Sequence, residues 1–131
     1  MRKSAEFSQI KTNPDPFEAF NLSQAISIGD LIFVSGQAAL DLEGNIIGSG
    51  DFDAQAEAAF KNLGMVLEAG GSDLSKVLKV TIFMTDISNF PKVVALRKKY
   101  FTQPYPADSI VEVSALALPE LEFEIEAIAT K

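Results

Sequence analysis

The sequence of 131 residues contains no cysteine and no histidine. Without cysteine, the chain can form no disulfide framework, thiol nucleophile or zinc–cysteine site. Without histidine, it lacks the usual general base at neutral pH and the commonest metal ligand. Any proton transfer must therefore use carboxylates, lysine, tyrosine, backbone groups or water, and we expect no metal site.

Positive charge and long apolar runs are also scarce. The chain has 11 Lys and Arg against 18 Asp and Glu, a net charge of -7. Such a chain repels phosphate backbones and anionic lipids, which argues against nucleic acid and membranes as partners. No run approaches the ~18 apolar residues of a membrane span, and the N-terminal MRKSAEFSQIK has no apolar signal region. We therefore expect a cytoplasmic protein.

What is present fits one globular domain over residues 1–131. A hairpin is predicted from runs 24–28 and 31–35, joined by Gly29-Asp30, with a short strand at 46–47. Helices are expected at 51–70 and 87–101, and further strands at 77–85, 110–114 and 122–130. This order predicts an α+β fold, a mixed sheet with two helices on one face.

Helix signals support these two assignments. Asp51 or Asp53 can cap the first helix, and Gly70-Gly71 can end it. Its apolar stripe consists of Ala56, Ala59, Phe60, Leu63 and Leu67. The second helix is expected to be capped by Ser88. Its last turn holds Arg97, Lys98 and Lys99, which suit the negative end of the helix dipole.

The strand patterns predict a sheet with one apolar and one mixed face. In the strand at 77–85, the expected inner face is Leu78, Val80, Ile82 and Met84, and the outer face is Lys79, Thr81 and Phe83. In the last strand, the apolar side is Leu121, Phe123, Ile125, Ala127 and Ala129, opposite Glu122, Glu124, Glu126 and Ile128. The outer face needs cover, and association into a closed ring would supply it.

Several segments resemble the reactive-intermediate deaminase (RidA/YjgF) family. They are SQA at 23–25, LIFVSGQ at 31–37, VLKVTIFMTD at 77–86, VEV at 111–113 and EIEAIA at 124–129. Each segment alone is weak, whereas their order and spacing together are specific. The resemblance implies a chorismate-mutase-like fold and a homotrimer with a central β-barrel, the helices lying outside it. It also implies small-molecule clefts between subunits, hydrolysis of 2-imino acids and enamines to 2-keto acids and ammonia, and no cofactor.

The resemblance also assigns site residues. Glu124 matches the catalytic glutamate, and Gly36 the glycine at the strand end that lets a ligand approach the backbone. Ser109 and Ile110 lie in the substrate-binding segment, where the Ile110 carbonyl can contact water. Two positions depart from the family: Leu22 replaces a tyrosine, and Asp108 replaces the arginine that grips the substrate carboxylate.

Asp108 reverses the charge at that anchor. A like-charge contact at about 4 Å costs ~4 kcal/mol at an effective dielectric near 20, so carboxylate substrates should be repelled. If Asp108 and Glu124 converge, one of them can keep its proton and the pair can bind an amine, a cation or a polar neutral molecule. Lys79, or a lysine of a neighbouring subunit, could instead compensate for the lost arginine.

Plainer interpretations exist for each residue. Asp108 can make an Asx-type bond in a turn, Glu124 can face solvent or a neighbouring lysine, and Gly36 can mark a bulge. Three functions follow: a deaminase with another anchor or other substrates, a metabolite-binding trimer without deaminase activity, or a ribonuclease or translation inhibitor. The last fits poorly, because the chain is acidic and lacks the usual histidine acid/base pair.

Overall fold

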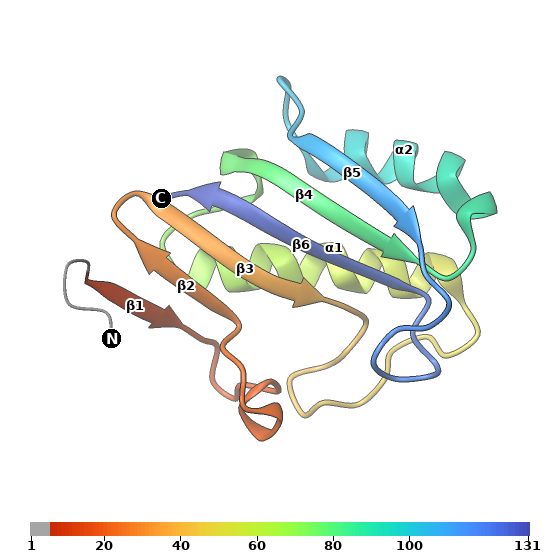
Figure 1. Ribbon diagram of the computed structural model, residues 1–131, viewed down its shortest axis with the longest axis horizontal. Coiled ribbons are helices and arrows are strands. Elements are labelled where there is room, and N and C mark those ends of the chain that lie inside the picture. The colour runs from red at the N-terminus through yellow and green to blue at the C-terminus, as the bar shows by residue number, and fades with distance from the viewer. Residues whose placement is uncertain (1–5) are drawn as a thin grey trace.

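A six-stranded mixed sheet forms the frame of the structure, a computed structural model that describes residues 6–131. Its strands are β1 (Phe7–Ile10), β2 (Ala25–Ile28), β3 (Leu31–Gln37), β4 (Val77–Met84), β5 (Ala107–Glu112) and β6 (Phe123–Thr130). They lie in the order β1-β2-β3-β6-β4-β5, with β4 and β5 parallel and all other neighbours antiparallel. The last strand of the chain therefore lies between β3 and β4, inside the sheet (Figure 1).

Two α-helices cover one face of this sheet, as the sequence predicts for an α+β fold (Figure 1). They are α1 (Phe52–Ala69), which packs on β3 and β6, and α2 (Phe90–Tyr100). Asp51 caps α1 by accepting a hydrogen bond from the Ala54 amide, and Gly71 adopts a positive φ just after the helix. All five residues of the predicted apolar stripe are fully buried.

The start of α2 differs from the prediction, whereas its end carries the predicted basic residues. Residues Ile87–Asn89 form a 3-10 turn, and the Asp86 carboxylate caps it by accepting a hydrogen bond from the Ser88 amide. The predicted capping of the second helix by Ser88 is therefore wrong. The last turn of α2 is fixed against α1, because the Tyr100 ring stacks on Phe60 with centroids 5.0 Å apart. This contact places Arg97 beside the edge strand β5.

The strand prediction contained two errors that cancelled in the count. No strand forms at residues 46–47, where the structure has a single bridge between Leu40 and Ile46. A strand that the sequence analysis did not assign, β1, pairs with β2 instead. Other short 3-10 turns are Glu18–Phe20 and Leu74–Lys76.

The predicted faces of the sheet are confirmed except at the start of β4. In β6 the apolar residues are buried and Glu124, Glu126 and Ile128 lie on the other face. Leu78 is 48% exposed instead of buried, because the pairing of β4 with β6 shifts by a residue between Val77 and Lys79. Val77 takes the inner position.

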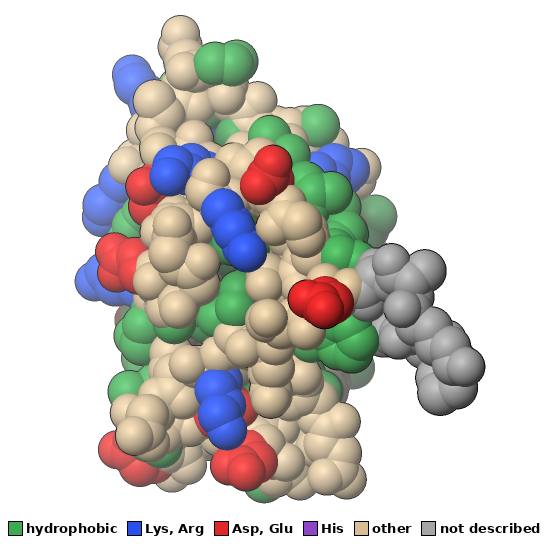
Figure 2. All heavy atoms as spheres, turned by 90° about the vertical axis from the view of Figure 1, so that its left-hand side faces the viewer, with side chains coloured by type: hydrophobic (Ala, Val, Ile, Leu, Met, Phe, Trp, Pro, Cys, Tyr) green, Lys and Arg blue, Asp and Glu red, His purple; other side chains and the backbone are tan. Residues whose placement is uncertain are grey.

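The face away from the helices is partly apolar and uncovered in a single chain. Leu31, Phe33 and Val111 are 38%, 44% and 42% exposed. At the side of the molecule where β1 lies, charges of both signs are interspersed with apolar side chains (Figure 2). Within residues 6–131, no helix is long and apolar enough to cross a membrane.

Candidate functional site

Glu124 projects from β6 into an apolar hollow of about 360 Å³, here called the Glu124 hollow. Its lining comes from segments far apart in the sequence: Phe17, Phe20, Leu22, Gly36, Ala38, Leu40, Ala117, Leu118, Leu121 and Glu124. Glu124 is the only ionisable residue in that lining. The structure therefore brings together three predicted site residues, Leu22, Gly36 and Glu124, against walls that the sequence analysis did not identify.

Gly36 makes room for the Glu124 carboxylate. A Cβ atom added to Gly36 would lie 2.3 Å from Glu124 Oε2, far inside van der Waals contact. Gly36 also lies within the register shift of β3 against β6 between Val34 and Gln37, so the bulge interpretation holds as well. Bulge and close approach are one feature here: the bulge re-aims the strand, and the missing side chain admits the carboxylate.

The Glu124 carboxylate is half-buried and accepts no hydrogen bond from any residue in the described range 6–131. Burial raises its pKa above the ordinary glutamate value, and the nearby charge of Glu126 raises it further. A raised pKa brings the carboxyl group closer to operating pH, where one group can both take up and release a proton.

Two amide side chains of α1 hold the walls of the Glu124 hollow. Gln55, fully buried, donates to the Glu120 carbonyl at 2.8 Å and accepts from the Glu122 amide at 2.8 Å. Asn62 donates to the carbonyls of Ala38 and Leu40, each at 2.8 Å. Both walls are thus fixed to the same helix, which limits how far they can move from Glu124.

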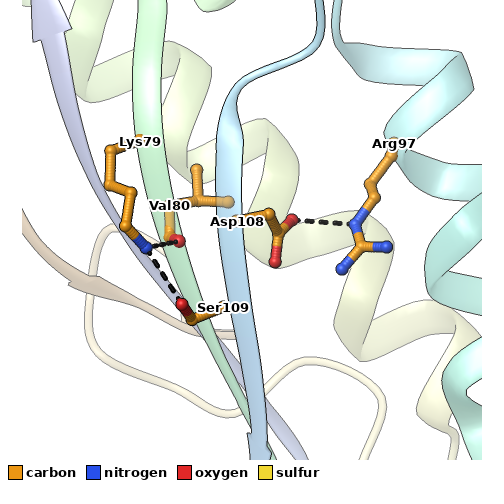
Figure 3. Close-up of polar contacts among 5 residues, drawn as sticks. All are labelled: Lys79, Val80, Arg97, Asp108 and Ser109. Atoms are coloured by element: carbon orange, nitrogen blue, oxygen red, sulfur yellow. Dashed lines mark hydrogen bonds and ion pairs between the residues drawn. The ribbon is translucent and has the colours of Figure 1, made fainter.

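Asp108 lies in a different hollow and has a partner. Its Oδ2 accepts a hydrogen bond from Arg97 Nε at 2.8 Å, an ion pair whose side chains are only 15% and 22% exposed (Figure 3). Asp108 is in strand β5, so the turn interpretation of this residue is wrong. The cation paired with Asp108 is Arg97 from α2 of the same chain, whereas Lys79 contacts Ser109.

The surrounding hollow, here called the Arg97 hollow, has a volume of about 540 Å³. It is lined by Pro91, Val94, Ala95, Arg97, Lys98, Tyr105, Pro106 and Asp108. The second Asp108 oxygen, Oδ1, is buried without a hydrogen-bond partner among residues 6–131. The sequence offers no signal for the Arg97–Asp108 pair, whose members are 11 residues apart in a helix and a strand.

Within one chain, Asp108 and Glu124 point to opposite faces of the sheet. Asp108 is the register partner of Val80, whose side chain faces the helices, whereas Glu124 is the partner of Phe83 on the other face. The sequence analysis considered the case in which Asp108 and Glu124 converge. They do not converge within one chain, and bringing them together would require a second copy.

The other two predicted residues of β5 separate in the same way. Ser109 lies on the open face, where Lys79 Nζ donates to its hydroxyl at 3.3 Å, on the side of β5 away from Arg97 (Figure 3). The Ile110 side chain packs against the core. In residues 6–131, no group of three or more acidic side chains is arranged to hold a metal ion.

Gln55 is the one supporting residue that the sequence could have revealed. It directly precedes Ala56 on the buried side of α1, and a polar residue among core positions needs hydrogen-bond partners. The apolar lining of the Glu124 hollow gave no such signal. Phenylalanine and leucine residues are common in any hydrophobic core, so their presence in the sequence does not indicate a ligand site.

Comparison with known proteins gives consistent matches. The sequence model of the family described as Endoribonuclease L-PSP matches residues 11–131. The chain is 40% identical over 119 residues to RutC family protein y4sK of Sinorhizobium fredii, covering 91% of this chain and 94% of that protein. It is 36% identical over 120 residues to human 2-iminobutanoate/2-iminopropanoate deaminase, covering 92% and 87% respectively.

Solved structures agree with these sequence matches. The crystal structure of RidA from the Antarctic bacterium Psychrobacter sp. PAMC 21119 superimposes with a TM-score of 0.86 at 33% identity. The match covers 95% of this chain and 99% of that one. Sequence and structure therefore indicate the same group of proteins over almost the whole chain.

Proposed function

The chain belongs to the endoribonuclease L-PSP family, the RidA/YjgF family, and from that premise we propose that it is a cytoplasmic homotrimer that hydrolyses imines and enamines. The observation that carries this proposal is the Glu124 carboxylate, half-buried beside Gly36 in an apolar hollow. Relatives named as deaminases of 2-imino acids share about a third of the sequence, which supports the reaction class.

In this reaction, Glu124 transfers protons. A water molecule adds to the imine carbon, forming a C–O bond while the C=N bond becomes single; Glu124 takes a proton from the water and gives it to the nitrogen. The carbinolamine then collapses: Glu124 takes the hydroxyl proton and gives a proton to the nitrogen, the C–N bond breaks, ammonia leaves, and a C=O bond forms. A carboxyl group with a raised pKa suits both the uptake and the return of the proton.

The trimer is proposed because each hollow of one chain is incomplete. The Glu124 hollow holds an acid but no cation, and the Arg97 hollow holds cations but no free acid. They belong to opposite faces of the sheet, so only association of copies could bring an Arg97 hollow against a Glu124 hollow. Exposed Phe33 and Val111 on the open face give such association an apolar surface to bury.

Ribonuclease activity, which the family description names, has less support here. The net charge of -7 repels a polyanionic substrate, and the chain has no histidine for the usual acid/base pair. Binding of metabolites without deamination is the remaining alternative, and the assay below distinguishes it.

The test measures ammonia release from freshly generated 2-iminopropanoate. We expect wild-type turnover above the spontaneous rate and a ~10²–10⁴-fold loss in Glu124→Gln, the range associated with a general acid/base. Glu43→Gln, at an exposed carboxylate that does not line the Glu124 hollow, is the matched control and should keep full turnover. A wild-type protein that binds 2-oxobutanoate without accelerating ammonia release would instead support the metabolite-binding alternative. A strictly monomeric mass by light scattering would refute the shared cleft.

A further inference from the structure

Arg97 is a fixed arginine with unused donors. Its Nε is committed to Asp108 at 2.8 Å, and its guanidinium carbon lies 5.5 Å from the centre of the Phe90 ring. Of the five N–H groups of an arginine, one is therefore used, and the four on the terminal nitrogens donate to no residue in the range 6–131. Figure 3 shows the two terminal nitrogens extending beyond the bond to Asp108.

We propose that Arg97, oriented by Asp108, is the binding group for a small organic carboxylate in the Arg97 hollow. The two terminal nitrogens form the end of a planar fork, which matches the two oxygens of a carboxylate. Phe90 and Asp108 restrain the guanidinium before any ligand arrives, so less rotamer entropy is lost on binding than at a free surface arginine.

The charge of the hollow favours an anion. Arg97 and Lys98 contribute two positive charges and Asp108 one negative charge, which leaves one positive charge in excess. The C-terminal end of α2 opposes this with a partial charge of about -0.5, which is smaller. Pro91, Val94 and Tyr105 supply apolar walls for the rest of the ligand. A carboxylate with a short carbon chain fits this combination of charge and lining.

The role of Asp108 changes accordingly. An unpaired aspartate at this position would repel a carboxylate, but Asp108 is neutralised by Arg97 and determines where the guanidinium lies. Asp108 is thus a positioning residue. Carboxylate binding by Arg97 can be tested by itself. Only its part in the reaction rests on the proposed function: Arg97 of one subunit would hold the carboxylate of an imino acid near Glu124 of the next.

The experiment compares 2-oxobutanoate with its neutral isostere 2-oxobutanamide by calorimetric titration. Wild type should prefer the carboxylate by roughly tenfold to a hundredfold, the range expected of a charge-assisted hydrogen-bonded pair. The double variant Arg97→Gln with Asp108→Asn, which replaces the ion pair by two amides, should bind both compounds equally. Arg97→Lys keeps the charge but loses the fork, and should keep a reduced preference.

Lys61→Gln is the matched control, because it removes one positive charge from the exposed face of α1, outside the Arg97 hollow, without touching the pair. It should keep most of the preference. A structural defect would weaken both ligands alike, whereas the inference requires loss of the preference itself. If the double variant retains the wild-type preference, or if wild type shows none, the inference is wrong. If Arg97 determines the preference and ammonia is still not released, the proposed reaction fails while the binding site stands.

Discussion

Two carboxylates of this protein, Glu124 and Asp108, each line a hollow, but their immediate surroundings differ. Glu124 has no hydrogen-bond partner in residues 6–131, apolar walls, and a pKa raised mainly by burial. The Asp108 side chain is 15% exposed and pairs with Arg97 at 2.8 Å. The first group can exchange a proton; the second holds a cation in place. Chemical identity alone does not separate these roles, because both are acidic residues in strands near the end of the chain.

The contrast depends on one backbone contact and one ion pair. Gly36 admits the Glu124 carboxylate, and Arg97 on α2 reaches the Asp108 carboxylate. Changing each contact tests its own region, and the expected effects differ in size.

The largest effect is expected from Gly36→Ala. Its φ is not positive, so alanine is permitted by the backbone, but the new methyl group would lie where the Glu124 carboxylate is. Moving a reacting group by about 1 Å can cost ~10²-fold, so we expect a ~10–100-fold loss of ammonia release in steady-state assays. Gly64→Ala in α1, whose added Cβ would meet only the Leu74 side chain at 3.3 Å, should keep activity. Equal losses in both variants would mean that Gly36 acts through stability.

A smaller effect is expected on stability when the ion pair is broken. Asp108→Ala leaves the mostly buried Arg97 without its partner and should lower the free energy of unfolding by ~1–3 kcal/mol in urea titrations. Asp53→Ala breaks the pair with Lys92, whose side chains are 70% and 51% exposed. That control should lose less than about 1 kcal/mol. Similar losses at equal protomer concentration would show that the Arg97–Asp108 pair behaves as an ordinary surface pair.

The smallest effect concerns the pH dependence of stability. Burial raises the folded-state pKa of Glu124, so the folded protein binds this proton more tightly than the unfolded chain. The resulting stability is present below the ordinary glutamate pKa and is lost as the pH rises through the folded value. Glu124→Gln has no carboxyl group to titrate at this position, so its stability relative to wild type should rise as the pH rises from the ordinary glutamate pKa through the folded value.

Denaturant midpoints measured at several pH values test this trend. Glu126→Gln removes the second cause of the raised pKa and should shift the curve in the same direction by less. A wild type that gains on Glu124→Gln as the pH rises would show that the carboxylate is stabilised in its charged form.

Much of the fold could be predicted because its signals are local. The stripe of α1 and the alternation of β6 follow from spacing alone, and both are confirmed. The errors fell where tertiary contacts decide: Leu78 faces outward because β4 is bulged against β6, and residues 46–47 make one bridge instead of a strand. A bulge reverses which face of the sheet the residues before it occupy, and no residue in 77–85 indicates where the bulge lies.

The candidate site divides in the same way. The family, the acid Glu124 and the glycine beside it are readable in the sequence, because they lie in segments whose order and spacing are specific. The resemblance also predicts that Asp108 stands where the family has an arginine. The partner of Asp108 could not be predicted, because it comes from a helix surface that packs beside β5 only once the sheet is formed. The sequence determined which charges the protein has; the packing of α2 against the edge strand decided which of them are paired.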